Sequence, residues 1–286
     1  MKLALILPTY NSSNYLDRLF QAVHQQTRQP DEIIVVDSDS HDDTVSICER
    51  YGARVMRLDG RPFNHGGTRR LASRTTQAEL VLMMTHDAVP ASPEAFATLV
   101  DALLSVPDAG MAFGRQLAHP GAGPLARHHR EFNYTAQSVI KRKADIPQMG
   151  IKTCWASDSF SLYRADALER VGGFPLDVVC CEDVFVAARM VLADYAVIYC
   201  GEAAVYHSHD YTLKQEFRRY FDNGLFYGRE KWITETFGTA TGEGLNFVLS
   251  ELKFLIAGGH WMAIPRSMGL TVAKLLGYHL GQWSCV

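Results

Sequence analysis

The clearest feature of the hydrophobic pattern is an unbroken apolar run, Leu80–Met84, which has no polar face. A strand buried on both sides has this pattern, and such strands belong to parallel sheets packed between helices. The run ends abruptly at His86 and Asp87. Because ligands bind outside the carboxyl ends of strands in open α/β sheets, we expect Asp87 at the ligand edge, holding a divalent metal. Capping the next helix is the alternative role, for which Ser92 is better placed.

Apolar runs and helical periodicity alternate through the first part of the chain. The predicted strands are Lys2–Leu7, Glu32–Val36 and Ala53–Leu58. Between these runs, the apolar spacing predicts one helix that ends near Gln26 and a second over Thr44–Tyr51. This order predicts a doubly wound parallel sheet with right-handed crossovers.

The later elements are less regular. Gly66 and Gly67 precede a helix predicted over Thr68–Thr75, and glycines at such a place let the backbone approach an anion. The segment His119–Met149 lacks periodicity, so it is either solvated helix and loops or a flap on the acceptor side. The other predicted elements are helix Pro93–Ser105, strand Met111–Gln116, strand Thr153–Tyr163, helix Arg164–Val171, a helix from Cys181 to about Ala193, strand Tyr195–Tyr199 and the extended segment Ala203–Tyr206.

Composition narrows the class of protein. The chain has 286 residues, 47% hydrophobic and 21% charged, as expected for a globular protein. Its net charge of −3 gives no signal for nucleic acid binding. The six cysteines show no metal-ligand spacing, which favours reduced thiols in the cytoplasm. Neither a signal peptide nor a spanning helix is expected.

Polar groups that follow successive strands should meet at one edge of the sheet. They are Pro8–Asn11 after the first strand, Asp37–Ser40 after the second and Asp87 after the central one, joined by Glu182 and Asp183 at a helix start. Transfer from a sugar nucleotide needs such a set, because a metal and an arginine stabilise the departing diphosphate and a base accepts the proton of the incoming hydroxyl. Oxygen ligands suit Mg²⁺ or Mn²⁺.

The segment LILPTYNSSNYLDRLFQAVHQQTRQPDEIIVVDSDSHDDT resembles the opening of glycosyltransferase family 2, the inverting enzymes of GT-A fold. The blocks FNHGGTRR, MMTHDAVP, GGFP…CCEDV and VYHSHDYTLKQEFRRYF resemble bacterial rhamnosyltransferases of polysaccharide synthesis. The resemblance spans essentially the whole chain. It implies an α/β GT-A fold. Past Tyr211 the pattern changes to helices rich in aromatic and basic residues, so we expect the GT-A domain over residues 1–210 and a helical region over residues 211–286.

The resemblance also implies roles by position. Pro8, Thr9 and Tyr10 would line the nucleoside pocket, with Asp37 facing the pyrimidine, Arg69 near the donor phosphates and His86 beside them. Asp87 would bind Mg²⁺ or Mn²⁺ with a downstream histidine, His207 in preference to His209. His86 stands where the family has its first metal-binding acid, so only Asp87 is assigned as a metal ligand from this motif. Trp155 and Asp158 would contact the sugar or acceptor, although a core role for Trp155 is the alternative.

Glu182 and Asp183 match the family's acidic pair before a helix. Asp183 is assigned as the general base and Glu182 as the group that orients it, and the reverse assignment stays open. Acids at a helix N-terminus are also favoured without any catalytic role.

The C-terminal stretches Leu245–Ile256 and Met268–Leu280 are amphipathic and carry basic residues. Such helices suit an anionic membrane surface, packing on the catalytic domain, or a homodimer. The resemblance implies dTDP-L-rhamnose as donor and a lipid-linked glycan as acceptor, at the inner face of the membrane.

The competing functions are transfer from a UDP- or GDP-linked sugar, sugar nucleotidyl transfer, and non-catalytic nucleotide-sugar binding. The loop Pro8–Ser13 has no basic residue for a triphosphate, which argues against nucleotidyl transfer. The incomplete acidic motif at His86 is the best argument for a non-catalytic binder.

Overall fold

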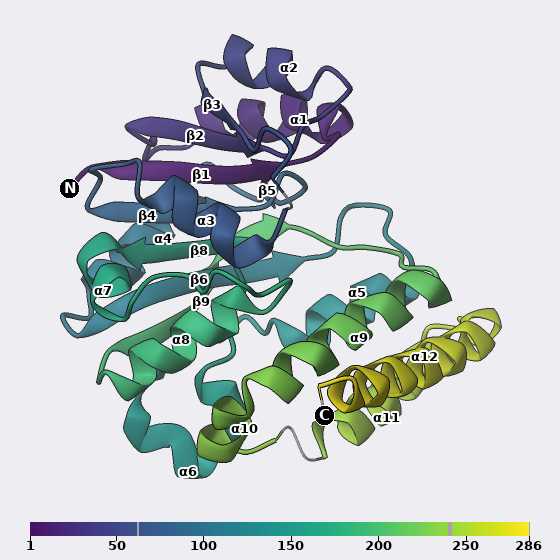
Figure 1. Cartoon of the computed structure of the whole chain (residues 1–286). Helices are drawn as coiled ribbons and strands as arrows, with labels where there is room; N and C mark the ends of the chain where they lie inside the picture. The colour runs from purple at the N-terminus through teal and green to yellow at the C-terminus, as the bar shows by residue number, and fades with distance from the viewer. Residues whose placement is uncertain (62, 240–241, 286) are drawn as a thin grey trace.

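The computed structural model describes residues 1–61, 63–239 and 242–285, and its centre is a single mixed sheet (Figure 1). Within these residues the sheet has nine strands in the order β3-β2-β1-β4-β8-β6-β9-β5, and β7 pairs with β9. The strands are β1 (Leu3–Thr9), β2 (Glu32–Asp37), β3 (Arg54–Arg57), β4 (Leu80–Met84), β5 (Val89–Pro90), β6 (Ala109–Leu117), β7 (Val139–Lys141), β8 (Phe160–Arg164) and β9 (Ala196–Tyr206).

Strands β1 to β4 form the parallel half that the sequence predicted. Strand β1 pairs in parallel with β2 and β4, and β2 pairs in parallel with β3. Their residues alternate between two cores, with Leu80 and Leu82 facing one and Val81 and Met83 facing the other. This double burial explains why the β4 sequence has no polar face.

Strand β8 turns the sheet into a mixed one, because it is antiparallel to both β4 and β6. Strand β9 then runs parallel to β6, so its carboxyl end reaches the same edge as that of β6, beside β5. This arrangement brings His207, the residue after β9, to Leu117 at the end of β6, where its N–H donates to the Leu117 carbonyl (2.8 Å).

Helices cover both faces of the sheet and form a separate group at the C-terminal end (Figure 1). Residues of α1, α2 and α4 join one core, and residues of α3, α7 and α8 join the other. The helices are α1 (Ser13–His24), α2 (Thr44–Arg50), α3 (His65–Ser73), α4 (Ala95–Leu104), α5 (Pro124–Asn133), α6 (Ile146–Met149), α7 (Ala165–Arg170), α8 (Glu182–Leu192), α9 (Leu213–Arg229), α10 (Lys231–Phe237), α11 (Glu243–Ala257) and α12 (Ile264–Trp283).

Helices α9 and α12 pack so closely that their backbones touch. A Cβ atom on Gly277 would lie 2.4 Å from the carbonyl oxygen of Phe217, and one on Gly281 would lie 2.1 Å from that of Phe221. Only glycine permits this approach. None of the helices in the described parts of the chain is long and apolar enough to cross a bilayer.

The fold class predicted from the sequence is confirmed, while several boundaries are wrong. The strand predicted over Thr153–Tyr163 is only β8, because its first half forms the end of a 3₁₀ turn and a polar turn. The segments Tyr195–Tyr199 and Ala203–Tyr206 belong to one strand, β9, which carries a register shift. The segment His119–Met149 contains α5, β7 and α6. The boundary at residues 210 and 211 stays a prediction.

Helix α3 also begins earlier than predicted, at His65, so both glycines lie inside its first turn. The Asn64 side chain caps this turn by accepting a hydrogen bond from the Gly67 N–H (2.5 Å). A Cβ atom on Gly66 would lie 2.1 Å from the carbonyl oxygen of Pro175, so this glycine serves close packing against the chain before α8.

Candidate active site

A carboxylate and two imidazoles meet at the carboxyl edge of the sheet. Asp87 follows β4, and His207 and His209 follow β9. The Nε2 atoms of His207 and His209 lie 3.4 and 3.3 Å from the two carboxylate oxygens of Asp87. One ligand atom from each residue lies within 4.8 Å of the others. The structure thus brings together Asp87 and His207, the two metal ligands expected from the sequence, and adds His209 to the same cluster, while metal binding stays a prediction.

Gln116 fixes the orientation of His207. The Gln116 side-chain oxygen lies 2.8 Å from Nδ1 of His207, and its amide nitrogen donates to the Ser157 hydroxyl (2.8 Å). This pairing places a proton on Nδ1, so Nε2 is the ring atom that faces Asp87 and His209. The two Nε2 atoms are only 3.0 Å apart, as expected for groups arranged to share a cation.

The charges of this cluster suit a metal. Burial and the nearby positive groups lower the pKa of His209 to about 4, so its imidazole is neutral at pH 7. Burial disfavours the ionised form of Asp87, but the nearby histidines His207, His209 and His86 together outweigh this effect and lower the pKa of the carboxyl group. Two imidazoles and one carboxylate form a donor set that fits Mn²⁺ better than Mg²⁺, which prefers oxygen ligands.

His86, the other candidate beside Asp87, lies outside this cluster. Its ring packs on that of Tyr15 in α1, with 5.5 Å between the centroids.

The same edge of the sheet holds the residues expected around the nucleoside. Tyr10 is 57% exposed at the end of β1, and Pro8 and Thr9 are buried beneath it. An exposed ring at a ligand edge is available to stack on a base.

Asp37 differs from the expectation that it faces a pyrimidine. Its side chain is fully buried and accepts hydrogen bonds from the Thr9 hydroxyl (3.1 Å), the Ser40 hydroxyl (2.6 Å) and the Ser40 N–H (2.8 Å). It therefore shapes the loop after β2 in the way loop aspartates commonly do.

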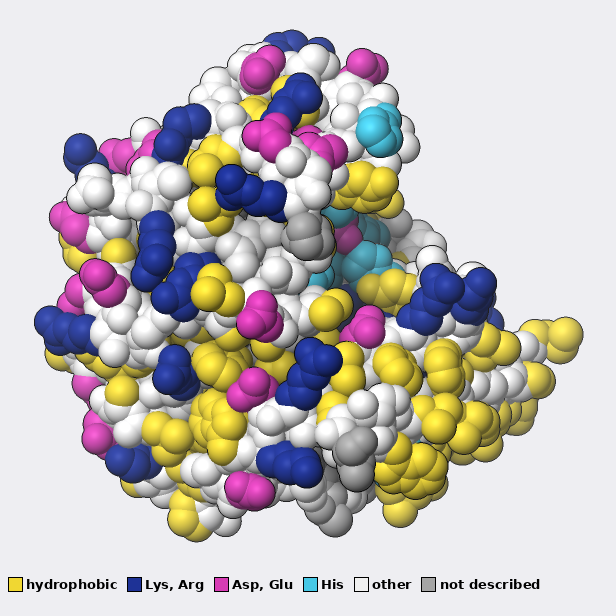
Figure 2. Space-filling view, viewed as in Figure 1, with side chains coloured by type: hydrophobic (Ala, Val, Ile, Leu, Met, Phe, Trp, Pro, Cys, Tyr) yellow, Lys and Arg dark blue, Asp and Glu magenta, His cyan; other side chains and the backbone are white. Residues whose placement is uncertain are grey.

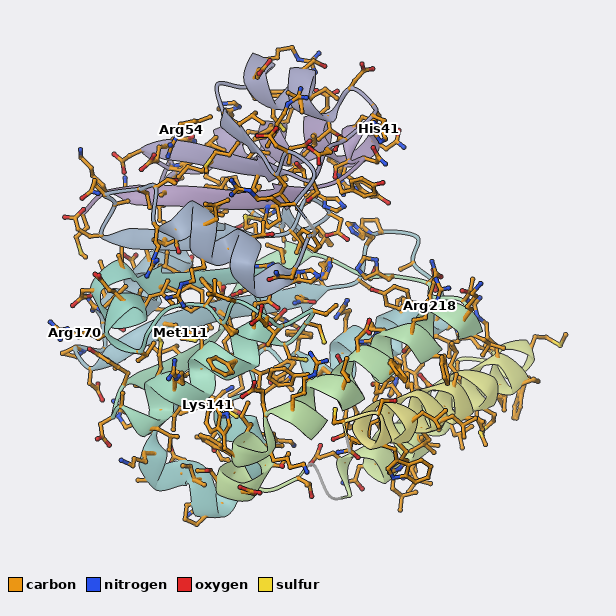
Figure 3. The ribbon with its side chains drawn as sticks, viewed as in Figure 1. His41, Arg54, Met111, Lys141, Arg170 and Arg218 are labelled. Atoms are coloured by element: carbon orange, nitrogen blue, oxygen red, sulfur yellow. The ribbon has the colours of Figure 1, made fainter. Side chains whose placement is uncertain are left out.

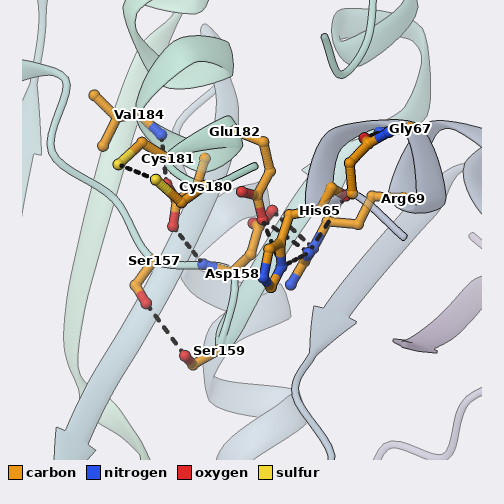
Figure 4. Close-up of polar contacts among 12 residues, drawn as sticks. His65, Gly67, Arg69, Ser157, Asp158, Ser159, Cys180, Cys181, Glu182 and Val184 are labelled. Carbon is orange, nitrogen blue, oxygen red and sulfur yellow. Dashed lines mark hydrogen bonds and ion pairs between the residues drawn. The ribbon is translucent and has the colours of Figure 1, made fainter. Parts of the chain in front are cut away.

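Arg69 lies in a buried ion-pair network and does not face open space (Figure 4). Its Nη1 atom is 2.8 Å from Glu182 Oε1, and its Nε atom is 3.2 Å from Asp158 Oδ2. All three side chains are at most 5% exposed. The Asp158 carboxylate also accepts a hydrogen bond from the Tyr163 hydroxyl (2.6 Å). The expected phosphate contact of Arg69 and sugar contact of Asp158 therefore do not match the burial of these residues.

The same network distinguishes the two acids at the start of α8. Glu182 is neutralised by Arg69, whereas no cation pairs with Asp183 among the described residues. Asp183 accepts hydrogen bonds from the N–H groups of Asp158 (3.1 Å) and Val184 (2.7 Å). Burial and the neighbouring carboxylates Glu182 and Asp158 raise the pKa of Asp183 well above its usual value. A carboxylate whose position is fixed by hydrogen bonds and whose pKa is raised has the properties of a general base.

Asp183 and the histidine cluster open onto one cavity of about 520 Å³. Figure 2 shows the hollow between the sheet domain and the C-terminal helices, with histidine and acidic side chains inside it. Its walls combine residues of both parts of the chain, among them His207, His209, Asp183, Trp155, Tyr134, Arg130, Arg219, Arg266 and Lys274. The helices after residue 211 thus complete the site.

Trp155 is a wall residue whose backbone is held by Lys141. The ammonium group of Lys141 donates to the Trp155 carbonyl (2.6 Å) and lies 4.6 Å from the centre of the Phe113 ring. Trp155 also packs against Tyr134, with 5.1 Å between the ring centroids. Its indole is therefore held partly in the core and partly at the cavity, which joins the two roles considered from the sequence.

Sequence reasoning missed the cationic wall of this cavity. Arg219 and Lys274 share the buried Glu216, with distances of 3.0 and 3.3 Å. Arg130 on α5 has no acidic partner in the described parts of the chain, and its guanidinium lies 5.7 Å from the centre of the Tyr134 ring. Arg130 lies in the segment His119–Met149, for which the sequence left a solvated helix or a flap open, so the direction of its side chain could not be predicted.

The whole chain resembles known glycosyltransferases in sequence. The model of the family "Glycosyl transferase family 2" matches residues 4–172. The O-antigen chain rhamnosyltransferase RfbN of Salmonella typhimurium is 45% identical over 284 residues, which cover 99% of this chain and 90% of that protein. The O-antigen chain rhamnosyltransferase WbaN of Salmonella anatum is 43% identical, over 97% of this chain and 88% of that protein.

Solved structures are similar to this fold at low sequence identity. The mannosyltransferase PcManGT from Pyrobaculum calidifontis, in complex with GDP-Man and Mn²⁺, aligns with a TM-score of 0.67 and 16% identity, over 99% of this chain and 86% of that one. S. aureus TarS 1-349 in complex with UDP-GlcNAc aligns with a TM-score of 0.56 and 16% identity, over 99% of this chain and 91% of that one. These likenesses show the fold.

The histidine cluster generates a prediction that needs no substrate. The protein should bind Mn²⁺ alone, and His209→Ala and Asp87→Ala should each weaken that binding at least about tenfold, because each removes a ligand atom. Titration calorimetry or the EPR signal of free Mn²⁺ measures the affinity. His41→Ala, a change at an exposed histidine outside the cluster, is the control. Equal Mn²⁺ affinity in all variants would contradict the assignment.

Proposed function

The chain belongs to glycosyl transferase family 2, and we propose that it transfers L-rhamnose from dTDP-L-rhamnose to a hydroxyl group of a growing, lipid-linked O-antigen glycan. The observation that carries this proposal is the identity of 45% and 43%, across nearly the whole chain, with two O-antigen chain rhamnosyltransferases. The reaction is a single displacement that inverts the anomeric carbon, with no covalent enzyme intermediate.

Asp183 is the base in this proposal. It lines the cavity, has no cationic partner among the described residues, and has a raised pKa. It accepts the proton of the acceptor hydroxyl as that oxygen attacks the anomeric carbon. Glu182 serves as a positioning residue, because its ion pair with Arg69 fixes the first turn of α8.

The donor diphosphate lies between the histidine cluster and the cationic wall. Asp87, His207 and His209 would hold Mn²⁺ or Mg²⁺, and a bound cation there supplies charge stabilisation for the departing diphosphate. Arg130 takes the phosphate-binding role that the sequence assigned to Arg69, because it lines the same cavity and has no acidic partner among the described residues. Tyr10 stacks on the base at the other end of the donor.

The acceptor glycan enters from the side of α9 and α12. Trp155 and Tyr134 offer aromatic surface to a sugar face, and Arg266 and Lys274 offer hydrogen-bond donors. The enzyme works in the cytoplasm, in peripheral contact with the inner face of the cell membrane, as a monomer or a homodimer.

The donor can be tested directly. Thermal shift with dTDP-, UDP- and GDP-linked sugars plus Mn²⁺ should give the largest stabilisation for dTDP-L-rhamnose, because ligand binding to the folded state raises its stability. With purified lipid-linked O-antigen precursor, only that donor should yield a product with one added rhamnose by mass spectrometry. A preference for a UDP- or GDP-linked sugar would replace the donor, and binding without any product would favour a non-catalytic role.

The two arginines should give opposite results. Arg69→Leu leaves the buried carboxylates of Asp158 and Glu182 without their cation, so it should lower the free energy of unfolding by about 3–5 kcal/mol. Arg130→Ala should leave that free energy nearly unchanged and weaken dTDP binding about tenfold, because a charge-assisted hydrogen bond is lost. Denaturant melts and calorimetry measure both quantities.

Arg127→Ala is the matched control, since Arg127 is exposed on the same helix and contacts His260. The assignment is wrong if Arg69→Leu is stable but weakens dTDP binding as much as Arg130→Ala does.

Asp183→Asn should keep donor affinity and lower kcat by about 10²- to 10⁴-fold, because an amide cannot accept the hydroxyl proton. The rate of the unmodified enzyme should fall as the pH drops through the raised pKa of Asp183, since the base is then protonated. Steady-state kinetics and a pH profile measure both effects. Asp210→Asn, at another acid of the same cavity, should retain activity. Near-normal turnover of Asp183→Asn would assign the base to another group.

A further inference from the structure

Helices α11 and α12 present large hydrophobic side chains to the outside. On α12 the exposed positions follow helical spacing, so they form one stripe along the helix. Its members are Met268, Val272, Leu275, Leu276, Leu280 and Trp283. On α11, Leu245, Leu249 and Ile256 form a similar stripe. The connection between the helices adds Trp261 and Met262, and Met262 is 94% exposed.

The opposite side of α12 explains why its large residues face outward. The side toward α9 consists of small residues, because Gly277 and Gly281 allow the backbones to touch. A helix at a protein surface normally carries its polar residues on the outside. Here the apolar side chains have no room inside, so their exposed face lacks an internal partner.

We propose that this face, formed by the outer sides of α11 and α12 and their connection, docks on a lipid bilayer with anionic headgroups. The charges of the region fit such a surface. The acidic residues within 242–285 are Glu243, which pairs with Lys152 at 2.7 Å, and Glu251, which is buried. The exposed charged residues of this segment are Lys253 and Arg266, and both are basic. An apolar helix face flanked by basic residues is the pattern of helices that lie in the membrane interface.

Shape and residue type favour a bilayer over a second copy of the chain. The α11–α12 hairpin projects from the body of the protein, and hydrophobic side chains continue to its tip (Figures 1 and 2). Trp261 and Trp283 lie near the two ends of α12, and tryptophan favours the membrane–water interface. The exposed Arg218 on α9 (Figure 3) adds positive charge next to this end of the molecule.

The docking face and the reaction cavity share one helix. Arg266, Leu270 and Lys274 of α12 line the cavity, while the outer stripe of the same helix faces away from it. Docking would therefore hold the cavity close to the headgroups. This last consequence rests on the proposed function, because it matters only if the acceptor glycan is attached to a lipid.

Vesicle co-sedimentation tests the face without donor or acceptor. The full chain should bind vesicles of phosphatidylethanolamine and phosphatidylglycerol, and bind vesicles of phosphatidylcholine more weakly. Met262→Asp should lower the partition coefficient at least about tenfold, because it places a charge at the inserted tip. Leu176→Asp is the matched control, since Leu176 is 57% exposed on the catalytic domain. It should bind like the unmodified chain. Thermal melts check that both variants are folded.

Two results would overturn the proposal. One is a lack of vesicle binding by the unmodified chain. The other is a dimer in sedimentation velocity that Met262→Asp dissociates while vesicle binding is unaffected, which would assign the face to a second copy. Transfer of rhamnose to a water-soluble glycan should be unchanged in Met262→Asp. Failure of the docking face is thus distinguishable from failure of the proposed function.

Discussion

The buried guanidinium of Arg69 is the contact on which the site depends. It joins Asp158, before β8, and Glu182, at the start of α8, to helix α3. Three segments that are distant in the sequence therefore have fixed relative positions. Because a buried carboxylate without a partner is strongly unfavourable, the ions require one another. Asp183 lies beside this network, but no cation compensates the charge of its carboxylate among the described residues. Its raised pKa follows from burial and from the neighbouring acids.

The topology of the sheet explains how the second half of the site forms. Strands β4 and β9 are not adjacent, yet the residues that follow both of them meet at one edge. Gln116, near the end of β6, then selects the tautomer of His207 and connects it to Ser157. The metal-binding candidates are thus oriented by the ends of strands, which are among the most rigid parts of the fold.

Much of the fold and of the candidate site was predictable from the sequence, and the wrong predictions share a physical cause. The doubly buried β4 and the alternation of the first strands and helices define the parallel half, because each signal is local. The positions of Asp87, His207 and Asp183 follow from strand and helix ends in the same way. The partners of Arg69 could not be predicted, because Asp158 and Glu182 come from two segments that are distant from α3 in the sequence. The strand predicted around β8 was too long, because the turn before β8 also alternates between polar and apolar residues.

A solvated helix was one of the two possibilities left open for His119–Met149, but the bounds of α5 were not predicted, because its residues Arg127–Arg130 are all charged or polar. The direction of the C-terminal stripes was equally hidden, since spacing alone does not tell an inner face from an outer one. On α12 the outward direction of the stripe follows from Gly277 and Gly281, which pack against α9, and this contact cannot be read from the sequence.

That contact also limits how the cavity can vary. Two helices that touch through their main chains at Gly277 and Gly281 cannot slide or rotate past each other without a steric clash. The distance between these walls is consequently set by the backbone. Discrimination among glycans must then reside in the side chains that project from a fixed frame, such as Leu270 and Lys274. Related chains could change their acceptor by exchanging those side chains while keeping the glycines.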